Sequence, residues 1–65
     1  MVQLYCFQVY AETFDGNWIE KVFRVFARSE IGAIYYLEES LFNMYDSWFI
    51  DECWIASPEE GTVLW

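Results

Sequence analysis

Residues 2 to 11 alternate between two sets of side chains that are both mostly apolar. One set is Val2, Leu4, Cys6, Gln8 and Tyr10, and the other is Gln3, Tyr5, Phe7, Val9 and Ala11. Aromatic and β-branched residues are enriched in strands, so this alternation predicts a β-strand. Because both faces are apolar, we expect the strand to lie in the centre of a sheet.

A hairpin turn and a second strand are predicted next. Asp15-Gly16 is a strong turn signal, because glycine accepts the positive φ that such turns need. Residues 18 to 28 then alternate, with Phe23, Val25 and Ala27 on one face, and Glu20, Arg24 and Arg28 beside Val22 and Phe26 on the other. The pattern predicts a half-buried strand with a basic outer stripe.

A helix is predicted from about Glu30 to Asn43. Ser29 is a good N-cap, and the Glu30 carboxylate complements the helix dipole in the first turn. With residues placed about 100° apart, the face expected to pack on the sheet contains Ala33, Ile34, Leu37, Ser40, Leu41 and Met44. The opposite face contains Ile31, Tyr35, Glu38, Glu39 and Phe42. Solvation alone does not explain the apolar members of this outward face, which makes it a candidate contact surface.

Residues 47 to 57 alternate as a third strand. Its two faces are expected to carry Trp48, Ile50, Glu52, Trp54 and Ala56, and Phe49, Asp51, Cys53 and Ile55. A turn is predicted at residues 57–61, and the sequence allows a short fourth strand at residues 62–65.

These elements predict a single α+β domain over residues 1–65, with the order ββαβ. A right-handed crossover through the helix places the third strand beside the first. We therefore expect a small antiparallel sheet of three to four strands in the order 2-1-3, with one helix packed on one face.

The charge is strongly asymmetric, and this narrows the classes of partner. Eleven acidic residues against three basic ones give a net charge of −8, and the segment after Ser29 holds eight carboxylates without one Lys, Arg or His. Such a segment is repelled by nucleic acid and by anionic lipid, and it is attracted to a basic protein surface. Lys21, Arg24 and Arg28 alternate with aromatic residues, which is a weak pattern for nucleic-acid binding. We expect these bases to pair with neighbouring acids instead.

Composition indicates a folded protein with surface aromatics. Hydrophobic residues make up 57% of the chain, and it holds four Trp, five Tyr and six Phe. A domain of this size buries only about 60% of its surface, so several aromatic rings are expected on the outside as contact residues. No signal peptide and no membrane-spanning run is predicted, which favours a cytoplasmic location. Cys6 and Cys53 are expected to be buried free thiols.

The sequence predicts no enzyme, no metal site and no cofactor. There is no His, and neither cysteine has an apparent base partner in the sequence. Adjacent carboxylates such as Asp51 and Glu52 point to opposite faces of a strand, so they do not form a glycosidase pair. The spacing of zinc ligands, of an EF-hand loop and of a phosphate loop is absent.

Mimicry of nucleic acid remains as an interpretation of the acidic half. A chain of this length is roughly 28 Å wide. Duplex DNA of that length carries around sixteen charges, of which about half face one side. Eight carboxylates match that number, whereas a general solubilising surface is the alternative.

The segment from Phe23 to Glu39 resembles the strand-to-helix passage of small phage-encoded ββαβ proteins. In size, acidity and lack of catalytic residues, the chain is similar to anti-CRISPR proteins that mimic nucleic acid and block a CRISPR effector. The resemblance implies that carboxylates stand in for phosphates against basic residues of the effector, while Tyr35 or Phe42 adds apolar contact.

The candidate partner-binding residues are Tyr35, Glu38, Glu39, Phe42, Asp46, Asp51, Glu52, Glu59 and Glu60. They predict a non-enzymatic inhibitor that binds the basic nucleic-acid-binding surface of another protein. The alternative is a homodimeric structural or accessory phage protein, with Trp48, Trp54 or Trp65 in its interface.

Overall fold

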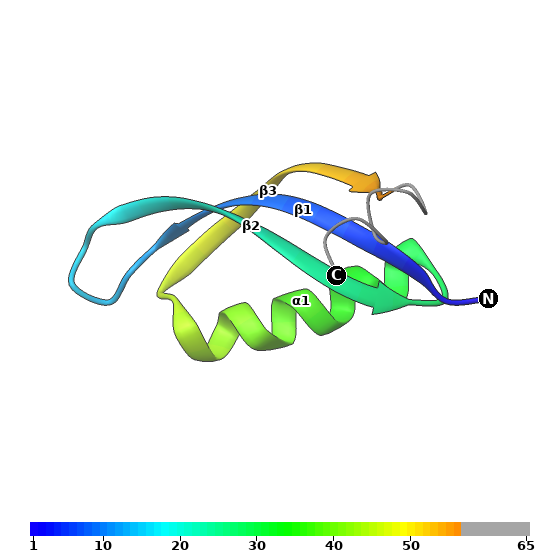
Figure 1. The fold of residues 1–65 in the computed structure, drawn as a ribbon. Helices are drawn as coiled ribbons and strands as arrows, with labels where there is room; N and C mark the ends of the chain where they lie inside the picture. Colours follow the sequence, from blue (N-terminus) through cyan, green and yellow to red (C-terminus); the bar gives the residue numbers. More distant parts are fainter. Residues whose placement is uncertain (57–65) are drawn as a thin grey trace.

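A computed structural model describes residues 1–56 of the chain. The elements are β1 (Gln3–Glu12), β2 (Trp18–Ala27), α1 (Glu30–Met44) and β3 (Ser47–Ile55). The three strands form one antiparallel sheet in the order β2-β1-β3, with α1 packed on one face (Figure 1). This confirms the predicted α+β fold. The turn at residues 57–61 and the fourth strand at residues 62–65 lie outside the described residues.

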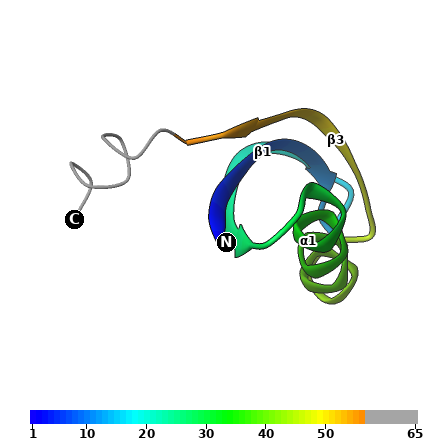
Figure 2. The same ribbon diagram turned by 90° about the vertical axis from the view of Figure 1, so that its right-hand side faces the viewer.

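The two faces of the sheet differ in what covers them. Figure 2 shows that the sheet is curved and that α1 lies on its concave side. We call the face toward α1 the inner face and the opposite one the outer face. On the inner face, Tyr5, Phe7, Val9 and Ala11 are buried in the core with residues of α1. On the outer face no helix or strand of residues 1–56 covers the sheet.

The hairpin turn forms where the sequence predicts it. The Thr13 amide donates to the Asn17 carbonyl at 2.8 Å, and the Gly16 amide donates to the Thr13 carbonyl at 3.0 Å. Gly16 has φ of +90°, a conformation that residues with a Cβ rarely adopt. The turn therefore sets the register in which Glu12 lies opposite Trp18.

The helix buries a narrower stripe than its sequence predicts. Ala33, Leu37 and Leu41 are buried and Ile34 is partly buried, but Ser40 and Met44 are exposed. The prediction was wrong for these last two positions because the narrow sheet reaches only a single row of α1. Tyr45, whose amide bonds to the Leu41 carbonyl at 2.9 Å as the helix ends, is buried instead.

The N-cap of α1 leads to a first testable prediction. The Ser29 hydroxyl oxygen accepts a hydrogen bond from the Gly32 amide at 3.1 Å. Ser29→Ala should lower the free energy of unfolding by about 1 kcal/mol, since that amide loses its side-chain acceptor. Urea denaturation followed by circular dichroism measures the change. Ser29→Asp is the matched control and should retain wild-type stability; an equal loss in both variants would contradict a capping role.

A β-bulge in β3 corrects the predicted faces of that strand. Ile50 lies opposite Val9 and Glu52 lies opposite Gln8, so Asp51 is an extra residue in the ladder. The alternation predicted from the sequence holds up to Ile50 and inverts after it. Cys53 and Ile55 consequently share the inner face with Trp48 and Ile50, whereas Glu52 and Trp54 lie on the outer face with Phe49. Without the bulge, Glu52 would point toward the core.

The bulge predicts different outcomes for two single-residue deletions. Deleting Asp51 leaves every other residue of β3 opposite its present partner, so we expect the free energy of unfolding to change by no more than about 1 kcal/mol. Deleting Ile50 removes one residue too, but it moves Asp51 opposite Val9 on the inner face and should destabilise the fold strongly. Urea denaturation compares the two. Equal destabilisation would contradict the assignment of Asp51 as the extra residue.

Candidate functional site

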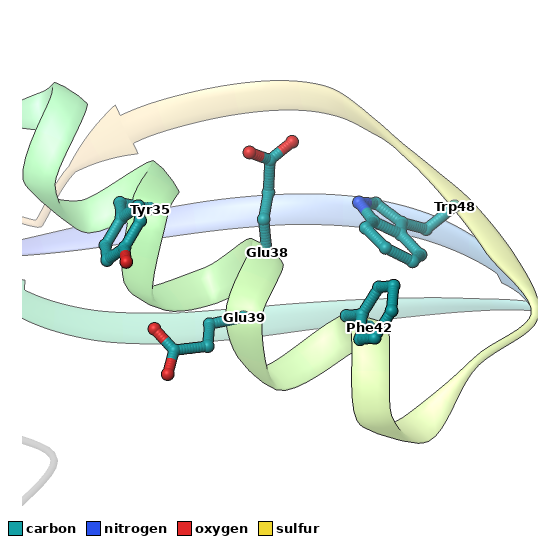
Figure 3. Close-up of a pocket in the computed structure, with 5 residues that line it drawn as sticks. All are labelled: Tyr35, Glu38, Glu39, Phe42 and Trp48. Carbon is teal, nitrogen blue, oxygen red and sulfur yellow. The ribbon is translucent and has the colours of Figure 1, made fainter.

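An open pocket lies between the exposed side of α1 and the start of β3. Its lining residues are Tyr35, Glu38, Glu39, Phe42 and Trp48, and its volume is about 370 Å³ (Figure 3). Four of the five are among the candidate partner-binding residues, and all four come from the predicted outward face of the helix. The structure therefore brings together the acidic and aromatic members of that face.

The geometry of the pocket separates its charged part from its apolar part. In Figure 3, Phe42 and Trp48 lie together at one end and Tyr35 at the other, with the two glutamates between these ends. The Glu38 carboxylate points to the β3 side, whereas the Glu39 carboxylate points away from it. Tyr35 is 66% exposed and Phe42 is 73% exposed. Two carboxylates flanked by accessible rings can bind a cation and an apolar group at the same time.

Trp48 belongs to this pocket, although the sequence-based site did not include it. The residue lies on the inner face of β3, is partly buried against the core and contributes to the pocket wall. A signal existed, because strand alternation places Trp48 on the same face as Ile50. Sequence alone did not show that this face of the third strand runs beside the outward side of the helix.

Three other candidate residues that the structure describes, Asp46, Asp51 and Glu52, do not line the pocket. Asp46 precedes β3, and its amide donates to the Glu12 carbonyl at 2.8 Å. Asp51 is the bulged residue, and Glu52 lies on the outer face opposite Gln8. Glu59 and Glu60 lie outside the described residues. The described acids therefore occupy several surfaces rather than one.

Electrostatics at the end of α1 reinforce the negative charge near the pocket. The last turn of the helix carries no basic residue, so its exposed carbonyl groups keep their partial negative charge. Asp46 lies two residues beyond the end of α1 and is exposed. No Lys or Arg lines the pocket. This end of the molecule is consequently attractive to cations.

The outer face of the sheet holds a second group of aromatic residues. The rings of Tyr10 and Phe49 stack with centroids 5.3 Å apart, and Trp18 packs on Phe49 at 6.3 Å. Glu20 accepts hydrogen bonds from the Gln8 amide and from the Tyr10 hydroxyl, the latter at 3.1 Å. This group joins all three strands across the uncovered face.

The basic residues do not form the predicted internal ion pairs among residues 1–56. Glu20 bonds to Gln8 and Tyr10, and Glu12 accepts a hydrogen bond from the Ser47 hydroxyl at 3.1 Å. Strand alternation also divides the bases, because Lys21 lies on the inner face and Arg24 on the outer face. Lys21 instead places its ammonium group 5.8 Å from the ring centroid of Phe23.

The contact between Tyr10 and Glu20 predicts a pH dependence. The hydrogen bond to the Glu20 carboxylate, together with its charge, raises the pKa of Tyr10 above the ordinary value of 10.0. A raised pKa stabilises the fold below pH 10.0, and that contribution is lost as the pH rises through the raised pKa. Glu20→Gln should lower the pKa of Tyr10. Absorbance titration of tyrosinate, with Tyr10→Phe as the difference control, measures it. A Tyr10 that titrates at its ordinary value in the wild type would contradict the contact.

The two cysteines differ from each other, contrary to the prediction that both are buried. Cys6 is buried on the outer face, whereas Cys53 is exposed. Both are free thiols. Partial burial raises the pKa of Cys53, and the negative charge of Glu30 adds to the increase. Cys53 therefore favours its neutral form, which lowers its nucleophilicity.

Two further findings concern only residues 1–56. The side chains of His, Cys, Asp and Glu form no group of three or more that could hold a metal ion. The helix of this part of the chain is too short to cross a membrane.

Comparisons of the chain with protein-family models, with curated proteins and with solved structures give no match.

Proposed function

We propose that this protein is a non-enzymatic inhibitor that binds the basic nucleic-acid-binding surface of another protein. The most concrete form of the proposal is an anti-CRISPR protein that blocks DNA or RNA binding by a CRISPR effector in the host cytoplasm. The observation that carries it is the pocket in which Glu38 and Glu39 lie beside three aromatic residues, Tyr35, Phe42 and Trp48.

The carboxylates of the pocket attract the basic surface of the partner and position it. Glu38 and Glu39 are exposed, and residues 29–56 add four more carboxylates without any base to neutralise them. A protein that binds nucleic acid presents Lys and Arg spaced to meet phosphates. Carboxylates on one helix can accept hydrogen bonds from the same side chains, and guanidinium groups bind them in the bidentate manner used for phosphate. Such complementarity increases the association rate, which then falls with salt.

The aromatic part supplies a slow dissociation rate that charge alone does not give. Tyr35 and Phe42 are largely exposed, and the partly buried Trp48 lines the pocket beside them. Arginine side chains stack on such rings, so an Arg of the target can be held by a carboxylate and by a ring together. Tyr and Trp are common among the residues that dominate binding energy. The pocket thus matches an Arg-rich surface better than a Lys-rich one.

The proposal is tested by capture from host lysate at low ionic strength. The tagged 65-residue protein is immobilised, bound proteins are eluted with a salt gradient, and the eluted proteins are identified. We expect one nucleic-acid-binding protein or effector complex to elute, and competing DNA or RNA to displace it as well. The matched control is Tyr35→Ala/Phe42→Ala, which keeps the charge and removes the rings; it should bind the same target but release it faster.

Two outcomes would overturn the proposal. Retention of no specific protein under these conditions would show that the acidic surface serves solubility alone. A specific partner whose binding is insensitive both to salt and to nucleic acid would show an interaction of another class.

A further inference from the structure

Within residues 1–56, the edge of β2 that faces away from β1 is an unpaired strand edge. In the part of the chain that the structure describes, β2 pairs with β1 on one side and has no neighbouring strand on the other. Its ten residues pair with β1 without a bulge. Trp18, Val22 and Phe26 along it are 56%, 41% and 61% exposed. Edges of this length and apolarity are templates for pairing with another strand.

The opposite edge of the sheet is protected. β3 is interrupted by the bulge at Asp51, and the adjacent Glu52 adds a second charge. Bulges and charged residues are devices that prevent edge-to-edge pairing. Two copies of the β3 edge would in addition repel each other, because β3 carries acids and no base. β2 is regular over all ten residues and carries charges of both signs, so of the two sheet edges in residues 1–56 it is the one suited to a second copy of the chain.

The hydrogen bonds of the hairpin determine which peptide groups of β2 point outward. The bond from the Thr13 amide to the Asn17 carbonyl makes Thr13 and Asn17 a hydrogen-bonded pair. Along an antiparallel ladder, hydrogen-bonded pairs alternate with non-hydrogen-bonded pairs. The residues of β2 whose peptide groups face β1 are therefore Ile19, Lys21, Phe23, Val25 and Ala27. Those whose amide and carbonyl groups face outward are Trp18, Glu20, Val22, Arg24 and Phe26.

An antiparallel pair of β2 strands related by a two-fold axis must place outward-facing residues opposite one another. The two-fold axis must therefore pass through a residue position and not midway between two residues. An axis midway between two residues would place a residue whose peptide groups point to the second copy opposite one whose peptide groups point to β1. Centring on Lys21 would put two lysines on the axis. Centring on Phe23 would leave Glu20 opposite Phe26. Centring on Val22 places Glu20 directly opposite Arg24 of the second copy, and it does so twice.

We propose that two copies of this chain pair through β2 in the antiparallel register centred on Val22, forming one continuous six-stranded sheet. On the outer face, each Glu20 meets Arg24 and each Trp18 meets Phe26 of the other copy. On the inner face, each Lys21 meets Phe23 and each Ile19 meets Val25. Opposite charges and aromatic pairs in directly opposed positions are the favourable cross-strand combinations. Both helices lie on the same side of the joined sheet.

This inference is independent of the proposed inhibitor function. The residues of the α1 pocket come from α1 and β3, and none comes from β2. A dimer joined through β2 leaves both pockets open and presents two of them to a partner. It differs from an aromatic interface built on Trp48 or Trp54, which lie on β3.

The experiment is a charge exchange followed by sedimentation equilibrium on the full 65-residue chain. The wild type should be a dimer at micromolar concentration. Glu20→Arg alone and Arg24→Glu alone each place like charges opposite one another twice, so the dissociation constant should rise about tenfold or more. An equimolar mixture of the two variants should associate again, because each charged residue then faces one of opposite sign.

The recovery in the mixture distinguishes loss of pairing from loss of folding. A variant that failed to fold would not regain association on mixing, and circular dichroism of each variant verifies the monomer. A monomeric wild type, including one whose β2 edge binds only a different protein, would overturn the proposal. So would single variants that dimerise like the wild type.

A cross-link tests the register by a second route. In the Cys53→Ser background, Val22→Cys should form a symmetric disulfide with oxidised glutathione as the oxidant. Cα atoms of a hydrogen-bonded pair lie about 5.5 Å apart, which is within the range that a disulfide spans. The matched control is Phe26→Cys, on the same face of the same strand but far from its own equivalent. Equal cross-linking of both would overturn the register.

Discussion

Phe7→Ala should leave most of the protein unfolded at room temperature. Phe7 lies in the middle of the central strand, is completely buried and belongs to the core that joins both layers. Its neighbours across the ladder are Phe23 on β2 and Cys53 on β3, so truncation opens a cavity in the middle of the sheet. A buried Phe→Ala substitution costs about 3–5 kcal/mol.

That cost is close to the whole stability of a small domain. A chain of 65 residues at roughly 0.05–0.15 kcal/mol per residue has only about 3–10 kcal/mol to lose. Urea denaturation monitored by tryptophan fluorescence and circular dichroism measures the effect. The matched control is Phe14→Ala, which removes the same atoms from a 70% exposed position in the turn and should leave stability nearly unchanged. Cooperative unfolding of Phe7→Ala at wild-type urea concentration would contradict this description of the core.

The regular part of the fold follows from local sequence patterns. The alternation in residues 2 to 11, the Asp15-Gly16 turn and the Ser29 cap each have a local physical cause, and the strand order follows from the handedness of the crossover. The central position of β1 was predictable because Leu4 and Cys6 are apolar on the face opposite Tyr5 and Phe7. Apart from the strand order, each of these signals depends on neighbours within about ten residues.

The bulge and the exact helix stripe were not predictable from such local signals. Trp48, Ile50, Glu52 and Trp54 alternate regularly in sequence, but the extra residue Asp51 inverts the alternation, so that Cys53 and not Glu52 lies opposite Phe7 on the inner face. That placement depends on the pairing with β1, which is remote in sequence. Likewise, the exposure of Met44 depends on where the narrow sheet ends.

The candidate site was predictable only in part, for a related reason. A helical wheel places Tyr35, Glu38, Glu39 and Phe42 on one face, and the structure places them in one pocket. Trp48 joins them because the start of β3 borders the same pocket, and a helical wheel does not include residues of another element. Glu52 was grouped with the helix acids by charge alone, and the bulge turns it to the outer face. A count of carboxylates therefore overestimates how many can meet one partner surface.

The second large effect is expected from reversing charge in the pocket. Glu38→Lys/Glu39→Lys changes the charge of the α1 pocket by four units, and it places two cations where the proposed partner presents Lys and Arg. We expect the affinity for that partner to fall at least a hundredfold at low salt. The loss should shrink as salt is added, because screening weakens both the original attraction and the new repulsion.

The control is a reversal of equal size at another place on the same chain. Asp51→Lys/Glu52→Lys alters the net charge equally but acts at the bulge of β3, away from the pocket. Affinity is measured by surface plasmon resonance across a salt series, with association and dissociation rates fitted separately. If the pocket carries the interaction, the helix variant loses far more affinity, mainly through slower association. Equal losses in the two variants would show that total charge attracts the partner and that the pocket has no special part. A loss that is the same at low and high salt would contradict electrostatic mimicry altogether.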